Sequence, residues 1–527
     1  MNLLSKTTVP STKSRSGALS AAIPWLVAAV TALAFWSCTR NGFINSDDPD
    51  FMIRPFRGLT PADLRGMFTT FYFSNYVPLS LLSFSVDNAL WGANPAGYHL
   101  TNVLLHAADA GLFCLLCREL LAFGGQSRDD GWWAAAAALF WSLHPLRVQS
   151  VAWVAERRDV LCGFFFLLSL LFWLRSFRSG KLRGSLGRTW AFVSFALALL
   201  AKAAAIPLVL VLVLLDVWPL KRSLRDPATW LEKLPFAALA ALFALLAKAA
   251  QGQGGGLVAA AKVAPLQRLN QIGIGLVFYA GKLLWPADLA LYEWHWAPVR
   301  SAVLIGTAAT LLLFILAWRS RGLRAPLLTA WVYQAVMLAP VLGIVTIGHE
   351  LVADRYSYLS GLGFALLFGA GLRLLARRSR PVASTLAVAS LAALATLTNA
   401  QIPVWRDSVS FWKQVARVDP QSLAARPSMV AALIARGRMG EAILELEEHV
   451  ALNPQDEEMK KALADLLART GTTERGHARL HEELALEFEA QGAYDKAAWH
   501  LEKALRYDPG SGRLKAELEK ARLGKGP

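Results

Sequence analysis

The stretch AAIPWLVAAVTALAFWSCTRNGFINSDDPDF, residues 21–51, places an apolar segment directly before a cluster of carboxylates. The apolar part, Ala21 to Cys38, is long enough to cross a membrane as a helix. An unpaired carboxylate in lipid is very costly, so Asp47 and Asp48 must face water or a charged partner at the membrane surface. The order Ser-Asp-Asp-Pro also suits an ordinary helix start. The stretch therefore predicts a spanning first helix and leaves two interpretations of the aspartates open.

The rest of the chain has the composition of a multi-pass membrane protein. Of its 527 residues, 55% are hydrophobic and 17% are charged, and the mean hydropathy is +0.38. Soluble domains carry about 25% charged residues. Apolar runs predict eleven spans, at approximately residues 21–39, 98–122, 131–153, 159–175, 186–201, 204–219, 234–250, 301–318, 326–347, 357–375 and 382–400. We therefore expect an all-α membrane bundle over residues 1–402 and a second domain over residues 403–527.

The distribution of charge predicts how the bundle is oriented. The chain has 54 basic and 38 acidic residues, and its last 125 residues hold 19 basic and 20 acidic ones. The basic excess therefore belongs to the membrane part, which makes nucleic-acid binding a poor interpretation of the pI of 9.9. The Lys and Arg clusters fall on one face if the N-terminus is cytoplasmic. We expect an integral protein of a bacterial-type inner membrane, with its repeats outside the cytoplasm.

Two segments need the charge pattern for their interpretation. Residues 186–219 have basic flanks on both sides, which predicts two short helices with a turn at Lys202 to Pro207. Residues 272–286 are expected to lie on the outer face or dip into it. The outer face then receives the first outer loop 40–97, the segments 154–158, 251–300 and 348–356, and everything after about residue 401.

The tail carries a repeat. The segments 437–454 and 492–509, GRMGEAILELEEHVALNP and GAYDKAAWHLEKALRYDP, align without gaps, each with a glycine 17 residues before its proline. Pro420 and Pro454 are 34 residues apart. This period resembles that of tetratricopeptide repeats, whose stacked helices bind peptides or proteins. A capped helical bundle without a ligand is the alternative.

Charged residues gather at the predicted outer turns, where the charge rule does not favour cations. Adjacent arginines beside carboxylates can bind a phosphate, whereas a histidine within a helix is more often packed. An aromatic loop could stack on a sugar or belong to the interfacial belt. The residues are His144, Glu156, Arg157, Arg158, Asp159, Lys202, Tyr292, Trp294, His349, Glu350, Asp354, Arg355 and Tyr356.

Together these groups suit a substrate with a lipid tail, a phosphate and a polar head, such as a polyprenyl-phosphate sugar. We expect the phosphate to be bound by four cations, Arg157, Arg158, Lys202 and Arg355, and the other residues of the set to contact substrate. Asp47 or Asp48 would be the general base for a hydroxyl of a protein or glycan, with inversion at the anomeric carbon. The sequence requires no cofactor and predicts no metal ligands, although a divalent metal is compatible with it.

The chain resembles the multi-spanning C-type glycosyltransferases with C-terminal tetratricopeptide repeats, and is similar to the TMTC-like protein O-mannosyltransferases. The resemblance covers nearly the whole chain. It is carried by the repeat tail and by NSDDPDF, GYHLTNVLLHAADAGLF, LHPLRVQSVAWVAERRDVL and ADRYSYLSGLGF. The resemblance implies that the chain transfers a sugar from a polyprenyl-phosphate donor on the outer face, and that this sugar is mannose or another hexose. It also implies that Asp47 and Asp48 belong to an acidic catalytic motif.

Two other functions fit parts of the sequence. A polyprenol-linked saccharide transporter would place ionisable residues near the middle of the membrane, and Asp109 and Asp216 lie inside apolar segments. A non-catalytic scaffold would use the membrane part only to present the repeats, and would not need Asp47, Asp48, Arg157 and Arg355 to meet in one cleft.

Overall fold

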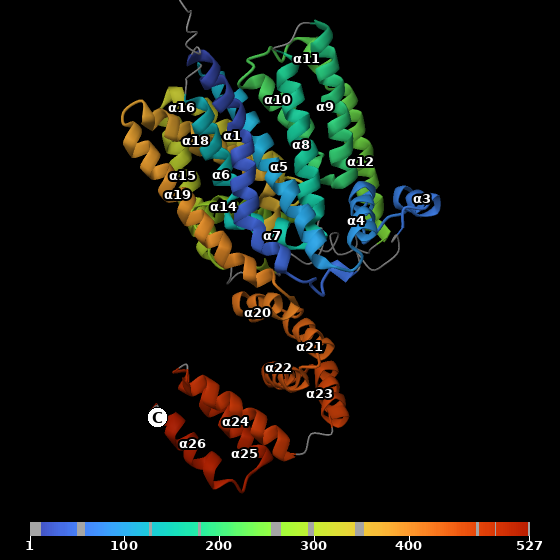
Figure 1. The fold of residues 1–527 in the computed structure, drawn as a ribbon, viewed down its shortest axis with the longest axis vertical. Coiled ribbons are helices and arrows are strands. Elements are labelled where there is room, and N and C mark those ends of the chain that lie inside the picture. The colour runs from blue at the N-terminus through green and yellow to red at the C-terminus, as the bar shows by residue number, and fades with distance from the viewer. Residues whose placement is uncertain are drawn as a thin grey trace, which may run out of the picture. The chain divides into compact units, whose positions relative to one another are not determined.

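The computed structural model describes residues 12–49, 58–125, 129–177, 181–253, 265–292, 300–342, 352–470, 474–490 and 492–524. The described residues are almost entirely helical (Figure 1). One short antiparallel pairing joins β1 (Leu291–Tyr292) to β2 (Val352–Ala353). The chain divides into two compact units, Met1–Ser422 and Leu423–Pro527.

The first unit is a bundle of long apolar helices. Seven helical segments of its described residues are long and apolar enough to cross a membrane, and a bent pair of helices makes an eighth if it is one span. The seven contain α1 (Thr12–Phe35), α5 (Pro95–Ala122), α8 (Arg157–Ser176), α9 (Lys181–Ala201), α12 (Leu234–Gln253), α15 (Arg300–Arg319) and α19 (Arg380–Gln401). The bent pair contains α17 (Ser357–Ser360) and α18 (Leu362–Ala376), with a 58° bend. The protein is therefore an all-α membrane protein.

Three of the eleven predicted spans are not among these helices. The segments 131–153, 204–219 and 326–347 contain α6 (Asp130–Ser142), α10 (Leu208–Val217) and α16 (Arg321–Leu338). Helices α6 and α10 are too short to cross a membrane alone, and α16 has 18 residues but is not apolar enough. A proline follows each helix end within three residues, at Pro145, Pro219 and Pro340. Proline cannot donate the backbone hydrogen bond that a longer helix needs. Apolar run length alone therefore overestimated the number of spans.

The predicted break at Lys202 to Pro207 is confirmed. Helix α9 ends at Ala201, and Lys202 has extended backbone angles, with φ −160° and ψ 136°. A single turn, η4 (Ala203–Ala205), then leads to α10. The break puts the Lys202 side chain at the end of two helices and not along the side of one.

Helices α14 (Pro265–Leu284) and α15 approach each other closely at two glycines. A Cβ atom added to Gly281 would lie 1.9 Å from the carbonyl oxygen of Ala302, and one added to Gly306 would lie 1.6 Å from that of Val277. Only glycine permits this backbone approach. Helix α14 includes residues 272–284 of the segment 272–286, whose place at the outer face stays a prediction.

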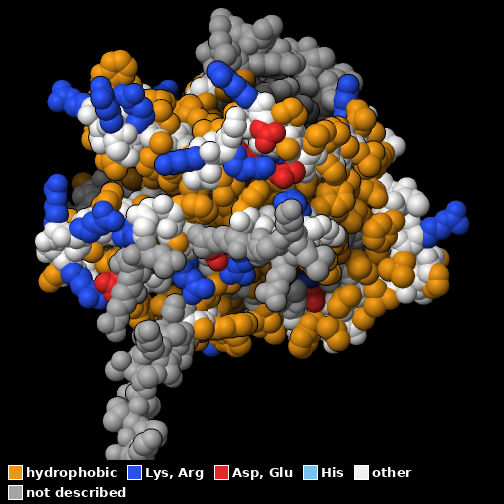
Figure 2. Space-filling view, turned by 90° about the horizontal axis from the view of Figure 1, so that it is seen from above, with side chains coloured by type: hydrophobic (Ala, Val, Ile, Leu, Met, Phe, Trp, Pro, Cys, Tyr) orange, Lys and Arg blue, Asp and Glu red, His pale blue; other side chains and the backbone are white. Residues whose placement is uncertain are grey.

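Short helices gather at one end of the bundle, the lower end in Figure 1. They are η1 (Trp36–Arg40), α3 (Pro61–Thr69), α4 (Pro78–Trp91), η2 (Pro145–Arg147), α7 (Val148–Ala152), η3 (Val154–Glu156), η6 (Asp354–Tyr356), η7 (Ile402–Trp405) and α20 (Ser408–Val418). The opposite end, which includes α11 (Pro227–Leu231), carries many Lys and Arg side chains with only a few acidic ones between them (Figure 2).

The second unit is wholly helical where it is described. It contains α21 (Ala425–Ala435), α22 (Met439–Leu452), α23 (Glu457–Thr470), α24 (Glu474–Ala490), α25 (Tyr494–Tyr507) and α26 (Gly512–Arg522). Gly437 and Gly492 have φ values of 72° and 73°, the left-handed conformation that suits glycine, in the turns before α22 and α25. These equivalent turns support the sequence alignment, whereas the tetratricopeptide assignment stays a prediction.

A candidate acid–base and phosphate site at the end of the bundle

The adjacent residues Asp47 and Asp48 have different surroundings. Asp48 is fully buried, and its Oδ2 and Oδ1 accept hydrogen bonds from the backbone N–H groups of Ile44 and Ala155, both at 2.8 Å. Burial raises the pKa of Asp48 to about 7, against the opposite effect of the two N–H donors. Asp48 therefore attaches the first outer loop to η3.

Asp47 points to a cation. Its side chain is 37% exposed, and a carboxylate oxygen lies 3.6 Å from Nη2 of Arg158. By contrast, the side chains of Glu156 and Asp159 are only 1% and 9% exposed. Asp47 is thus the carboxylate of this group that a molecule from solvent can reach.

The loop that carries both aspartates is held from two sides. The backbone N–H of Gly42 donates to the carbonyl of Arg406 at 2.8 Å. The N–H of Asn45 donates to Oγ of Ser408 at 2.9 Å, and the indole of Trp412 donates to Oδ1 of Asn45 at 2.8 Å. Because η7 and α20 supply these contacts, the loop is fixed before any substrate arrives.

Glu156 is the centre of the charged cluster. It accepts hydrogen bonds from Arg158 and Lys202, both at 2.8 Å, and pairs with Nε of Arg355 at 3.3 Å. These cations come from the start of α8, the break after α9, and η6. A buried carboxylate needs such partners, and here one carboxylate gathers three cations in one place.

Asp159 completes the cluster on α8. Its Oδ1 pairs with Lys202 at 2.8 Å, and its Oδ2 accepts from Ser150 at 3.1 Å. Burial alone would lower the pKa of Lys202, but Asp159 and Glu156 outweigh it and raise that pKa above its ordinary value. Lys202 therefore stays protonated, and its side chain is still 19% exposed.

Arg355 lies against aromatic rings. Its guanidinium carbon is 5.6 Å from the ring centre of Trp153 and 5.1 Å from that of Tyr356. Its backbone N–H donates to Oε1 of Gln149 at 2.7 Å. A stacked guanidinium keeps its N–H groups directed sideways, and this side chain is 13% exposed.

Sequence reasoning missed Gln149, Ser150 and Trp153, which orient Arg355 and Asp159. All three lie in the quoted motif RVQSVAWVAERRD, beside the charged residues that were selected. Their position in the sequence next to the charged residues could have indicated that they belong to the site.

The structure does not bring Arg157 to the cluster. Its guanidinium is completely buried and pairs with Asp87, while Nε donates to Oδ1 of Asn102 at 2.8 Å and Nη2 to the carbonyl of Tyr98 at 2.7 Å. The prediction that Arg157 binds phosphate is therefore not supported, because successive residues at the start of α8 point in different directions. Arg157 connects α8 to α4 and α5.

His144 is also engaged in packing. Its Nδ1 accepts the backbone N–H of Leu146 at 3.3 Å, and its Nε2 lies 3.1 Å from the carbonyl of Leu283, to which it can donate. With both nitrogens used inside the protein, the predicted contact with substrate is not supported. This agrees with the packed-histidine alternative.

The remaining predicted residues follow the short strand pairing. Pairing of β1 with β2 places the backbone of Tyr292 beside Val352, close in sequence to Arg355. Asp354 is buried, and its Oδ1 has no hydrogen-bond partner among the described residues. Tyr356 is half-buried beneath the Arg355 guanidinium. Trp294, His349 and Glu350, and the side chain of Tyr292, lie outside the described residues.

Within the described part of the chain, no group of three or more His, Cys, Asp or Glu side chains has an arrangement that could hold a metal ion. The cluster is instead a set of ion pairs with one accessible carboxylate and partly accessible cations. Such a set can accept a proton at Asp47 and stabilise an anion at Lys202 and Arg355.

Comparison with known proteins finds partial similarities. No family model matches the chain. Protein O-mannosyl-transferase TMTC2 of Mus musculus is 42% identical over 118 residues, which are 22% of this chain and 13% of that protein, and the Homo sapiens protein gives the same values. Protein O-mannosyl-transferase TMTC4 of Homo sapiens is 34% identical over 145 residues, 25% of this chain and 19% of that protein. The matches thus span less than a fifth of these relatives.

Among solved structures, ArnT from Cupriavidus metallidurans bound to undecaprenyl phosphate is similar at 17% identity and a TM-score of 0.35, over 74% of this chain and 77% of that one.

Proposed function

We propose that the chain is an integral membrane glycosyltransferase that transfers a sugar from a polyprenyl-phosphate donor to a hydroxyl group of a protein or glycan. The partial sequence similarity to protein O-mannosyl-transferases supports this proposal and makes mannose the first donor sugar to test. The site supports it independently, through the combination of a carboxylate that can take a proton and cations that can stabilise a leaving phosphate.

The relationship of Asp47 to Arg158 carries the proposal. Asp47 is accessible, whereas Asp48 has both oxygens occupied by backbone N–H groups. A general base must reach the proton that it removes. We therefore assign the base to Asp47, and a positioning role to Asp48.

The proposed reaction is a single displacement. The acceptor oxygen attacks the anomeric carbon and gives its proton to Asp47. The bond between that carbon and the phosphate oxygen breaks, and the oxygen keeps the electron pair. Lys202, Arg158 and Arg355 stabilise the negative charge that develops there. Attack opposite to the leaving group inverts the anomeric configuration.

The acceptor would approach from the β1–β2 side. Pairing of Tyr292 with Val352 supports this direction, because it starts the aromatic loop beside the segment that carries Arg355. Within the proposal, Tyr292, Trp294, His349, Glu350, Asp354 and Tyr356 line the acceptor and sugar positions, and the repeat unit holds a protein acceptor.

The test is a transfer assay with the purified full chain, polyprenyl-phosphate mannose and serine- and threonine-rich peptides. The matched control for D47N is D129N, because Asp129 is a similarly exposed carboxylate, at 31%, that pairs with Arg380 at 3.0 Å. We expect loss of transfer in D47N alone. Transfer by D47N at the wild-type rate would exclude the proposed base, and movement of the intact donor across liposomes without transfer would favour the transporter alternative.

A further inference from the structure

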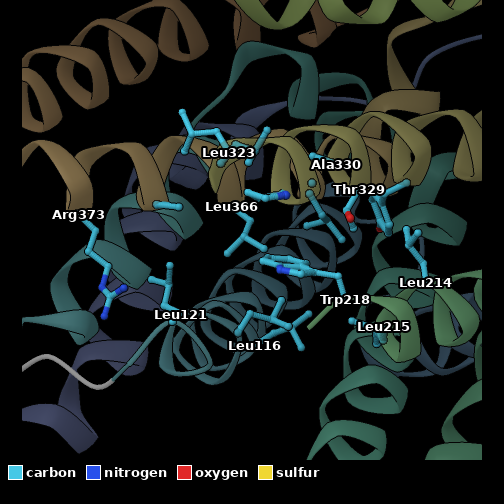
Figure 3. A pocket seen from close by; sticks show the side chains of 18 of the residues that line it. Leu116, Leu121, Leu214, Leu215, Trp218, Leu323, Thr329, Ala330, Leu366 and Arg373 are labelled. Atoms are coloured by element: carbon cyan, nitrogen blue, oxygen red, sulfur yellow. The ribbon is translucent and has the colours of Figure 1, made fainter. Parts of the chain in front are cut away.

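A cavity of about 320 Å³ lies within the first unit (Figure 3), and no residue of the charged cluster is among those that line it. Side chains of α5, α8, α10, α16 and α18 line it. Leu116, Leu214 and Leu366 form parts of its wall, and the indole of Trp218 lies among them. The walls are almost wholly apolar, and no acidic residue lines them.

The lining of the cavity follows α18 along its length. Its lining on α18 extends from Leu362 to Arg377, which corresponds to about 22 Å of helix at 1.5 Å per residue. A small volume that is spread over such a length fits a linear hydrocarbon chain better than a compact ring system.

The mouth of the cavity lies at the basic end of the bundle. There the lining residues Leu323 and Leu374 are 37% and 43% exposed, and Arg377 is exposed. The end of α5, the start of α16 and the end of α18 meet at this mouth. At the other end, Phe113, Tyr333 and Leu362 are buried.

Two arginines at the mouth differ in their partners. Arg373 is bound by both oxygens of Asp130 and by the carbonyl of Gly125. The described residues offer the Arg377 guanidinium no hydrogen-bond or ion-pair partner. The ends of α15, α16 and α19 and the turn after α18 add further cations, namely Arg319, Arg321, Arg324, Arg378 and Arg380.

We propose that this cavity binds one acyl chain of an anionic phospholipid, with the phosphate group at Arg377. An apolar slot accommodates a hydrocarbon chain, and a guanidinium without a protein partner at its mouth can bind an anion next to that chain. The lipid would come from the leaflet at the basic end. This inference does not depend on sugar transfer, because the cavity shares no residue with the charged cluster.

Native mass spectrometry of the full chain, incubated with phosphatidylglycerol or phosphatidylcholine in detergent, tests the proposal. We expect retention of phosphatidylglycerol and about a tenfold weaker retention in R377Q. The matched control is R378Q, which removes the neighbouring arginine that does not line the cavity. It should retain the lipid like the wild type.

A second variant tests the slot itself. Ala330 lines the cavity and is 6% exposed, so A330F would fill part of it and should reduce retention of both lipids. Equal retention by wild type and R377Q would overturn the proposal. So would complete competition by inorganic phosphate, which would show an anion site without a chain, or displacement by polyprenyl phosphate, which would show that the cavity holds the donor tail.

Discussion

The backbone N–H of Ala155 donates a hydrogen bond to Oδ1 of Asp48 at 2.8 Å, across 107 residues of chain. This bond fixes the first outer loop to the residues that precede Glu156, Arg157 and Arg158. Asp47, the preceding residue, is instead 37% exposed and lies 3.6 Å from Nη2 of Arg158.

The first prediction concerns stability. In D48N, the side-chain NH2 would face a backbone N–H at one of the two positions where Asp48 accepts, so one buried donor would lose its acceptor. We expect a loss of about 1–3 kcal/mol in the free energy of unfolding, seen as a lower midpoint in thermal unfolding of the detergent-solubilised protein. D47N should unfold within about 0.5 kcal/mol of wild type. Equal destabilisation by the two variants would contradict the different roles.

The second prediction concerns catalysis. Removing a general base lowers the rate about 10²- to 10⁴-fold, so D47N should lower kcat by that factor and leave the KM for the donor within about twofold. Steady-state transfer kinetics at several donor concentrations measure both. A large rise in KM with unchanged kcat would show that Asp47 binds the donor and does not take the proton.

The third prediction concerns pH. Burial raises the pKa of Asp48 to about 7 in the folded chain, above about 3.9 for an exposed aspartate. The folded state then holds the proton more tightly, so this group stabilises the fold at low pH and loses that contribution as pH rises from about 4 to 7. The unfolding midpoint of the wild type should therefore fall relative to that of D48N between pH 5 and pH 8. If the difference between the unfolding midpoints of the wild type and D48N increased with pH, the raised pKa of Asp48 would be contradicted.

The fourth prediction concerns the Glu156 cluster. E156Q removes the carboxylate that pairs with Arg158, Lys202 and Arg355, and breaking a buried pair costs about 3–5 kcal/mol. Lys202 also pairs with Asp159, so we expect the loss in the double variant E156Q/K202M to be smaller than the sum of the losses in E156Q and K202M. A double-mutant cycle of thermal unfolding measures the coupling. Additive effects would show that the pair does not interact.

The fifth prediction concerns helix packing. A methyl group at Gly306 cannot fit 1.6 Å from the carbonyl oxygen of Val277, so G306A must separate α14 from α15 and should cost about 1–3 kcal/mol. G371A is the control, since nothing lies within 4 Å of its added Cβ in α18. Alanine is the better helix former by about 1 kcal/mol, so G371A should be neutral or stabilising. Thermal unfolding distinguishes the two.

Apolar runs predicted the positions of the long helices because burial in lipid and in the bundle both select apolar side chains. The break at Lys202 was predicted from basic residues on both flanks of residues 186–219, which required the chain to turn. The helices α6, α10 and α16 were also predicted, but they were counted as spans that are longer than the helices the structure shows.

The charged cluster was predicted as a group, but its members could not be sorted. Arg157 and Arg158 are adjacent and chemically identical, and only the position of Asp87 on α4 shows which one is enclosed. Similarly, the roles of Asp47 and Asp48 depend on the Ala155 backbone, which has no side-chain signature in the sequence.

Three cations from distant parts of the chain pair with Glu156, and this has a consequence for biosynthesis. The three cations are made at residues 158, 202 and 355, so a ribosome must synthesise most of the membrane unit before the last one is available. Until then, the nascent membrane unit lacks the Arg355 guanidinium and the neighbouring strand β2. The cluster can thus be completed only late in translation, and chains that terminate before Arg355 should be recognisable to quality control as unfinished.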